Sequence, residues 1–172
     1  IRWDVAYMDS RKEFPFPEES FNYILGEHLI EHLTLEEGQS MLQECFFTLK
    51  NGGKLRLSTP DLRFITNLYT PTSENEEYIR SVTNRFLPSL VGKSDYRPLF
   101  VINNAFYNFE HKFLYDEGLL REMFEYAGFK NIQRFIYGQS EDPHLLNIEM
   151  HSKGVGIKGI SEIESLVLEG TK

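Results

Sequence analysis

Residues 21–59 contain the signals of a strand, a helix and a second strand in succession, and this unit restricts the fold more than any other part of the sequence. The first strand is predicted from Phe21 to Leu25, which includes the consecutive apolar residues Tyr23, Ile24 and Leu25 and is stopped by Gly26. A strand that does not alternate is typical of a parallel sheet covered on both faces. The second strand is predicted from Lys54 to Thr59. The unit therefore predicts an α/β fold with parallel central strands.

The helix between these strands has signals at both ends and along one face. Thr34 and Glu37 form a capping box at its start, and Asn51-Gly52-Gly53 supplies residues that readily adopt positive φ at its end. Apolar residues recur on one face at the spacing i, i+3, i+4 and i+7: Leu42, Cys45, Phe46 and Leu49. A later helix is predicted to begin at Asp116 and to end at Gly128.

Residues 61–115 differ from the rest because they hold eleven of the 24 aromatic residues and show no strand-like alternation. We expect a helical insertion or lid there, with breaks near the three prolines Pro71, Pro88 and Pro98. After the second helix, strands are predicted at 130–137 and 165–169, with a loop region at 138–162 between them. The sequence thus predicts one domain over 1–172.

Composition excludes several classes of protein. The 172 residues carry a net charge of −8, which disfavours a surface that grips a nucleic acid backbone. No apolar run approaches the roughly 20 residues of a membrane span, so we expect no membrane partner. The single cysteine, Cys45, cannot form an intramolecular disulfide and fits a reducing compartment, so a cytoplasmic location is expected.

Several motifs resemble those of class I S-adenosylmethionine-dependent methyltransferases. The run from Asp9 to Ile24 resembles the pattern D…LPFPDNSFDxI, Glu27 to Leu33 is similar to xHVLEHL, and Leu49 to Leu55 is similar to LKPGGxL. Three further segments resemble a subgroup of this family whose members are usually called predicted methyltransferases: 110–116, 127–129 and 138–143. The order and spacing of these motifs cover most of the chain.

This resemblance implies a Rossmann-like methyltransferase sheet with S-adenosylmethionine as cofactor and a methyl acceptor of unknown identity, a small molecule or a saccharide. By resemblance the cofactor would be bound by Asp9, Ser10, Glu27 and His28. The family's glycine-rich turn and its ribose-binding acidic residue would precede residue 1, so we expect a sheet truncated at its N-terminal side. Three alternatives follow: the chain is a fragment of a longer protein, the strand predicted at 5–8 moves inward to pair with Phe21 to Leu25, or a second chain completes the sheet.

Two histidines are candidate catalytic residues. His28 follows the strand after which the family places residues that face cofactor and substrate, although a partly exposed histidine in the first turn of a helix is an equal alternative. His111 occupies a histidine position of the subgroup and could take a proton from the acceptor. The alternative for His111 is a hydrogen bond to a helix end. Asp61 is expected to cap a helix rather than to act in catalysis.

The same region also spells H-x-x-E-H with His28, Glu31 and His32, the pattern of an inverted zinc-peptidase motif. Two histidines four apart on a helix share a face and can bind zinc, with the glutamate activating water. This alternative, a zinc hydrolase, needs a third ligand from among His111, His144 and His151. The methyltransferase motif produces the same letters, so we expect no metal site.

Other sequence features leave the partner and the activity open. Gly154, Gly156 and Gly159 spell G-x-G-x-x-G, but only 13 residues follow, so a loop is expected rather than a cofactor site. A locally basic stretch hints at an anionic acceptor, with a solvated helix face as the alternative: Arg80, Arg85, Lys93 and Arg97. A homodimer through an exposed sheet edge and a non-catalytic remnant or assembly module are further expectations.

Overall fold

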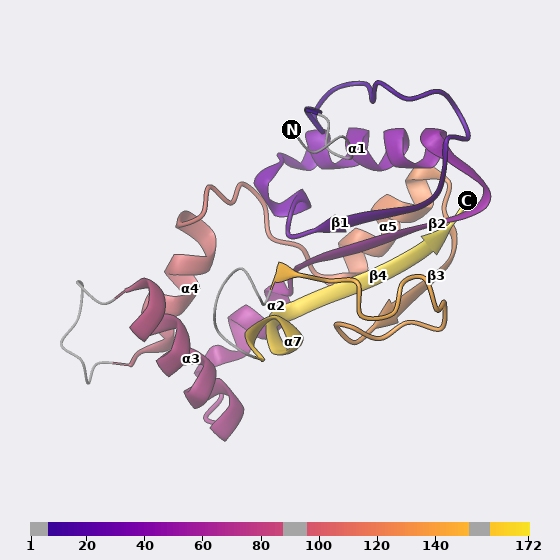
Figure 1. Ribbon diagram of the computed structural model, residues 1–172. Helices are drawn as coiled ribbons and strands as arrows, with labels where there is room; N and C mark the ends of the chain where they lie inside the picture. The colour runs from indigo at the N-terminus through magenta and orange to yellow at the C-terminus, as the bar shows by residue number, and fades with distance from the viewer. Residues whose placement is uncertain (1–6, 88–95, 152–158) are drawn as a thin grey trace.

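The computed structural model describes residues 7–87, 96–151 and 159–172. At its centre lies one sheet of four strands in the order β1–β2–β4–β3 (Figure 1). The strands are β1 (Phe21–Glu27), β2 (Leu49–Pro60), β3 (Lys130–Phe135) and β4 (Ser165–Thr171). The helices are α1 (Leu35–Thr48), α2 (Leu62–Thr66), α3 (Ser73–Phe86), α4 (Pro98–Tyr107), α5 (Glu117–Ala127) and α7 (Ile160–Glu164). Two 3-10 helices, η1 (Ile30–His32) and η2 (Asn67–Tyr69), complete the described elements.

The strand–helix–strand prediction is confirmed, because β1 and β2 are parallel and α1 connects them. The rest of the sheet differs from the expected parallel arrangement, since β4 runs antiparallel to both β2 and β3. The reason lies in α7, which precedes β4 directly and sits at the carboxyl end of β2, where the backbone N–H of Asp61 donates to the carbonyl of Glu164 at 2.7 Å. A strand that starts at that end must run back along β2.

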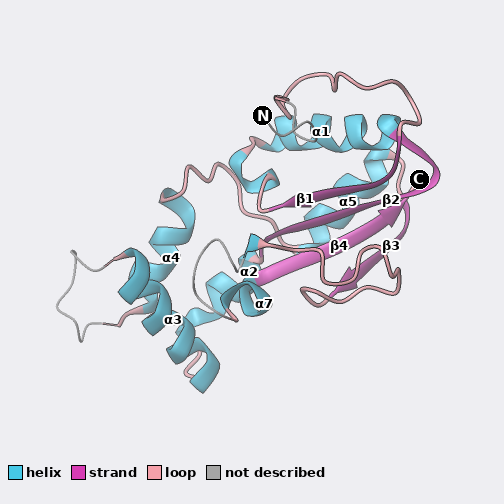
Figure 2. Cartoon of the chain, in the orientation of Figure 1, coloured by secondary structure: helices cyan, strands magenta, loops and turns pink. Residues whose placement is uncertain are grey.

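The two long helices that flank the sheet begin where the sequence predicts, and α5 also ends there. The predicted end of α1 is wrong, because α1 stops at Thr48 and Leu49, expected on its apolar face, begins β2. Thr34 and Glu37 form the full capping box of α1, and Asp116 caps α5, which ends at Gly128 in the left-handed conformation with φ of 107°. Both helices contribute to the core of the sheet's apolar face, whose fully buried members include Leu42, Leu55, Leu57, Leu120, Phe124, Leu166 and Leu168. Figure 2 shows both helices beside the four strands.

The opposite face of the sheet carries a buried charge. Arg56 of β2 is fully buried and bonds to Glu169 on β4 and to Glu149 from the segment after β3. Leu55 and Leu57 alternate with polar residues in β2, so the second face of this strand is polar. Residues 136–151 fold back over this face and bury it.

The helical part of the chain extends from the carboxyl ends of β1 and β2 (Figure 2). The helices α2, α3, α4 and α7 form a second apolar core, separate from that of the sheet: Ile65, Leu68, Tyr78, Ile79, Val82, Val101 and Ile160. The expected helical, aromatic-rich insertion is therefore present, and Asp61 caps α2 as predicted, with its side chain accepting from the N–H of Arg63. The expectation of loop at 138–162 is wrong at its end, since α7 begins at Ile160.

The first strand is less buried than its apolar sequence suggests. Tyr23 and Leu25 are 38% and 39% exposed, because β1 is an edge strand that pairs only with β2 among the described residues. The strand expected at 5–8 lies partly outside the described residues, and Tyr7 and Met8 are not in a strand. Gly154 and Gly156 also lie outside them, while Gly159 precedes α7 with φ of 82°.

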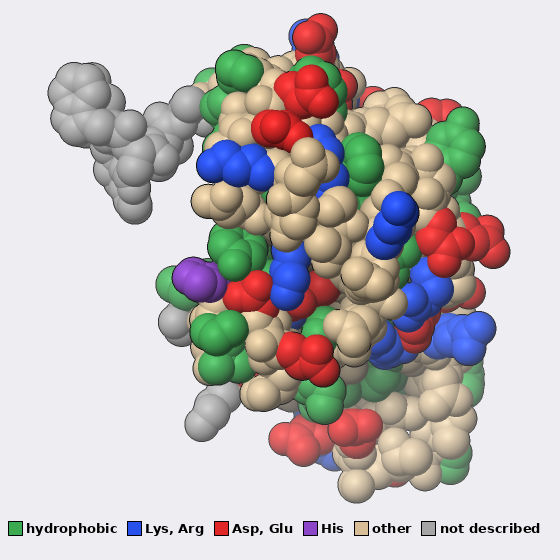
Figure 3. Space-filling view, turned by 90° about the vertical axis from the view of Figure 1, so that its right-hand side faces the viewer, with side chains coloured by type: hydrophobic (Ala, Val, Ile, Leu, Met, Phe, Trp, Pro, Cys, Tyr) green, Lys and Arg blue, Asp and Glu red, His purple; other side chains and the backbone are tan. Residues whose placement is uncertain are grey.

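The described helices are all too short or too polar to cross a lipid bilayer. On the face shown in Figure 3, the side chains of acidic and basic residues lie interspersed among apolar and neutral ones. The negative net charge is thus not gathered into one patch on this face.

Candidate functional site

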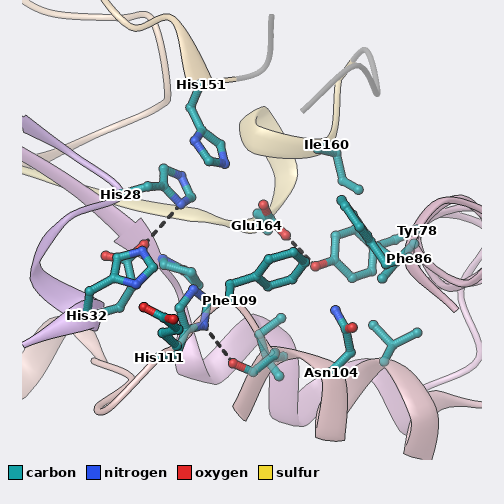
Figure 4. A pocket seen from close by; sticks show the side chains of 17 residues that line it. His28, His32, Tyr78, Phe86, Asn104, Phe109, His111, His151, Ile160 and Glu164 are labelled. Carbon is teal, nitrogen blue, oxygen red and sulfur yellow. Dashed lines mark hydrogen bonds and ion pairs between the residues drawn. The ribbon is translucent and has the colours of Figure 1, made fainter. Parts of the chain in front are cut away.

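A cavity of about 540 Å³ lies between the carboxyl ends of β1 and β2 and the helices α3, α4 and α7 (Figure 4). One wall is apolar and comes mainly from the helical part of the chain: Ile65, Val82, Phe86, Val101, Ala105, Phe109 and Ile160. The carboxyl ends of parallel strands are where α/β sheets bind their ligands. The helical insertion therefore supplies a pocket wall at the position where the sheet is expected to be functional.

The other wall is polar and rich in histidine. Four of the five histidines in the sequence line the cavity: His28, His32, His111 and His151. The carboxylates of Glu31 and Glu164 line it as well. An apolar pocket with a few converging titratable groups is a typical binding or catalytic site.

His28 is held on both ring nitrogens and by its backbone. Its Nδ1 lies 3.2 Å from Oε1 of Glu31, its Nε2 lies 3.1 Å from Oγ of Ser165, and its N–H donates to the carbonyl of Ser58. The backbone at His28 has φ of 45°, a conformation that favours glycine. The residue thus lies on a left-handed turn at the end of β1, and the alternative of a position in the first turn of a helix is wrong.

Glu31 joins His28 to the rest of the site. The carboxylate is completely buried, and its Oε2 accepts a hydrogen bond from Oγ1 of Thr59 at 3.1 Å. Burial disfavours the charged form, but the hydrogen bond and charge of His28 outweigh it and lower the pKa of Glu31. A charged Glu31 therefore orients the imidazole of His28.

His111 lies on the same cavity wall and is oriented by the helical insertion. Its Nδ1 lies 2.7 Å from the backbone carbonyl of Ala105 near the end of α4, which is the helix-end contact expected from the sequence. A carbonyl can only accept, so Nδ1 carries the proton and Nε2 keeps a free lone pair. Burial lowers the pKa of His111, which keeps the ring neutral near pH 7. His111 therefore both contacts a helix end and lines the cavity.

Of the other residues expected to bind the cofactor, two carboxylates are already bonded within the chain. Glu27 accepts from the hydroxyl of Tyr137 and from the backbone N–H groups of Met150 and His151, each at 2.8 Å. Asp9 accepts from Nε and Nη2 of Arg11, which lowers the pKa of Asp9 to about 2. Ser10 lies beside Asp9 in a turn, and neither residue lines the cavity. Their roles toward a cofactor stay predictions.

The sequence did not single out the cavity residues Tyr78 and Glu164, and it named His151 only as a possible third zinc ligand. His151 stacks on His28 with ring centroids 3.7 Å apart, and burial together with His28 lowers the pKa of His151 to about 4. Glu164, whose pKa burial raises, accepts a hydrogen bond from the hydroxyl of Tyr78. Each comes from a segment far from His28 in sequence, and nothing in its local pattern marks it as functional.

The H-x-x-E-H pattern does not form the helix that a zinc peptidase needs. His28 precedes the short η1 turn, so His28 and His32 do not share a helix face. Instead, each belongs to a different group of possible ligand atoms, one with His151 and Glu164 and the other with Glu31 and His111. The alternative in which His28 and His32 bind one zinc ion from a shared helix face is therefore wrong.

Strained backbone is concentrated at the cavity. Six described residues other than glycine have φ in the left-handed region, and three of them line the cavity: His28, Phe109 and Glu110. Such strain costs roughly 1–3 kcal/mol per residue and is typical of functional sites. None of the three described residues of the basic stretch, Arg80, Arg85 and Arg97, lines the cavity, so an anionic acceptor stays a prediction.

The sequence matches no protein-family model and no curated protein. Among solved structures it is similar to an S-adenosylmethionine-dependent methyltransferase from Archaeoglobus fulgidus, with 15% identity and a TM-score of 0.54 over 99% of this chain and 68% of that one. It is also similar to a "possible exported protein" of Bordetella parapertussis, with 13% identity and a TM-score of 0.53 over 96% of this chain and 42% of that one.

A third similar structure is an S-adenosylmethionine-dependent methyltransferase from Thermotoga maritima, with 16% identity and a TM-score of 0.48 over 96% of this chain and 62% of that one. At these identities the likeness concerns the fold. The chain spans about two thirds or less of the length of these three proteins. Together with the parallel β1–α1–β2 unit and the site at its carboxyl end, the likeness shows that this chain has the fold of the class I S-adenosylmethionine-dependent methyltransferases.

Proposed function

We propose that this chain acts in S-adenosylmethionine-dependent methyl transfer and binds the methyl acceptor in the cavity. The observation that carries this proposal is the cavity itself, which joins an apolar wall to histidines at the carboxyl ends of β1 and β2. A volume of about 540 Å³ is within the range of small-molecule sites. The acceptor is then a small molecule with an apolar body and one nucleophilic oxygen or nitrogen.

His111 is the residue we assign to the acceptor's proton. Because Nδ1 donates to Ala105, the neutral ring presents Nε2 as a base on the cavity side. Its lowered pKa keeps this nitrogen unprotonated near pH 7. His28, held by Glu31 and Ser165, is a positioning residue on the neighbouring wall. The apolar wall excludes water and orients the acceptor.

The cofactor supplies an electrophilic methyl group when it is bound. Asp9 is bonded to Arg11 and Glu27 accepts from donors of its own chain, so the cofactor would be held near the carboxyl end of β1 through His28 rather than by these two carboxylates. His28 is the one expected cofactor residue that lines the cavity.

A second candidate function is a non-catalytic module that keeps the fold. One observation favours it, namely that Glu27 uses its carboxylate to hold residues 150–151 against the end of β1. A carboxylate used in this way supports structure rather than ligand binding.

Transfer of an isotopically labelled methyl group tests the two functions against each other. The protein is incubated with labelled S-adenosylmethionine and a panel of small phenols, amines and carboxylic acids. We expect one class to be methylated, and His111→Gln to lower the rate about 10²–10⁴-fold, as loss of a general base does. His144→Gln, a change at an exposed histidine outside the cavity, is the matched control. Methylation of nothing in the panel, with labelled cofactor recovered intact, would favour the non-catalytic module.

A further inference from the structure

The two histidines and the glutamate at one corner of the cavity have the composition of a metal site. His28, His151 and Glu164 each offer a ligand atom, and these atoms lie within 4.8 Å of one another. Figure 4 shows the two rings and the carboxylate around the same corner. Two histidines with one carboxylate is a ligand set used for Zn²⁺ and other divalent transition metals.

We propose that His28, His151 and Glu164 bind one divalent transition-metal ion at the cavity wall. The three residues come from the end of β1, from the segment after β3 and from the end of α7, so only the folded chain brings them together. A tetrahedral ion with ligand bonds of about 2.1 Å would hold its ligand atoms about 3.4 Å apart. Binding therefore draws the ligand atoms together by at most about 1.4 Å. The rings of His28 and His151 are stacked with their planes 4° apart, so one ring must also turn for both nitrogens to point at the ion.

The surroundings of two of the ligands have the form that metal sites need. A histidine ligand generally donates its second ring nitrogen to a carboxylate or a carbonyl, which fixes the ring. Nδ1 of His28 lies 3.2 Å from Oε1 of the buried Glu31, and this leaves Nε2 for the ion. The hydroxyl of Tyr78 donates to Oε2 of Glu164, which leaves Oε1. Ser165, whose Oγ lies 3.1 Å from Nε2 of His28, would give up that contact or join the ion.

The third ligand is held in place by its backbone. The N–H of His151 donates to Oε1 of Glu27 at 2.8 Å, so the saturated carboxylate of Glu27 has a role in fixing the position of this histidine. Upstream, Glu149 is anchored on the buried Arg56. These contacts hold residues 149–151 against the sheet before any ion binds.

Such an ion would leave a coordination position open toward the cavity. A hydroxyl or phenol oxygen of a ligand in the cavity would fill it, and the ion would lower the pKa of that group. The inference concerns metal binding alone and does not depend on methyl transfer. A failure of one proposal therefore leaves the other standing.

Titration of the chelator-treated protein with Zn²⁺ by calorimetry and with Co²⁺ by visible absorption tests the proposal. We expect one ion per chain and the absorption bands of a histidine-ligated Co²⁺ ion. His151→Phe keeps a ring to stack on His28 but has no ligand nitrogen, and Glu164→Gln keeps the size of the side chain. Each should weaken binding by about tenfold or more, with an unchanged thermal unfolding midpoint showing that the variant folds.

Two control variants show where an ion sits. His144→Phe changes an exposed histidine and should leave binding unchanged. His111→Gln removes a ligand of the neighbouring group formed by Glu31, His32 and His111, and it should also leave binding unchanged. The proposal is overturned by the lack of stoichiometric binding, or by binding that His111→Gln abolishes and His151→Phe does not.

Discussion

Nε of Arg56, a fully buried side chain in the middle of β2, donates a hydrogen bond to Oε1 of Glu149 at 2.6 Å. The same guanidinium donates from Nη1 to Glu169 on β4 at 2.5 Å and to the carbonyl of Gln139 at 2.9 Å. One side chain thus ties two strands to the segment that carries His151. The polar face of the sheet and the histidine wall of the cavity are therefore one connected structure.

Replacing this arginine tests that connection. Arg56→Met leaves two buried carboxylates without their cation, and we expect the free energy of unfolding to fall by about 3–5 kcal/mol. The matched control is Arg134→Met, because Arg134 pairs with Asp61 and Glu117 but is 43% exposed; its loss should cost about 1 kcal/mol or less. Urea unfolding of both variants measures the difference. An equal fall in the free energy of unfolding of the two variants would contradict a larger contribution from the buried Arg56.

The end of α5 offers a second test, of backbone conformation. Gly128 has φ of 107°, and a Cβ there would lie 2.9 Å from the ring of Phe46. Gly128→Ala should therefore destabilise the protein by about 1–3 kcal/mol. Gly118→Ala, at the start of the same helix with its nearest atom 3.4 Å away, should instead stabilise it by up to about 1 kcal/mol. Thermal unfolding of the pair checks both signs, and destabilisation by both would refute the argument.

The single cysteine provides a probe of unfolding. Cys45 is buried on the apolar face of α1, and burial raises the pKa of its thiol to about 12. We expect iodoacetamide at neutral pH to leave the native protein unmodified and to label it fully in denaturant. Mass spectrometry gives the labelled fraction. Labelling of the native protein at the rate of a free thiol would show that α1 detaches from the sheet.

Asp142 should make stability depend on pH in the acid range. The N–H of His144 and the ammonium of Lys54 lower the pKa of Asp142 from 3.8 to about 2. Because the folded pKa is the lower one, this stabilisation is present above about pH 3.8 and is lost as the pH falls toward 2. Asp142→Asn should thus be less stable than the parent at pH 6, and the difference should shrink in acid. Denaturant unfolding between pH 6 and pH 2.5 measures this difference in stability. A difference that does not change with pH would show that the charge of Asp142 does not contribute to it.

Local signals in the sequence were sufficient to predict the helix ends that are capped by neighbouring residues. The capping box of Thr34 and Glu37, and the pair Asp116 and Gly128, act within one or two turns, so they predict the start of α1 and both ends of α5. The polar face of β2 could not be predicted in the same way. Its exposure depends on whether residues 136–151 fold over it, which is a contact between distant segments.

The same reasoning explains what was and was not foreseen of the candidate site. His28 and His111 are foreseeable because the resemblance to methyltransferase motifs places them, and both line the cavity. Glu164 becomes part of the site only because α7 and β4 turn back along β2, and His151 only because residues 136–151 fold over the sheet and are held by Glu27. Periodicity carries no information about such a return.

Binding of S-adenosylmethionine to the protein, measured by calorimetry, tests the proposed function most directly. We expect saturable binding of one molecule per chain, which S-adenosylhomocysteine competes away. His28→Ala should weaken this binding, while His144→Gln, at an exposed histidine outside the cavity, should not. If neither compound binds at millimolar concentration to a protein that unfolds cooperatively, the proposal of methyl transfer is contradicted and the non-catalytic module takes its place.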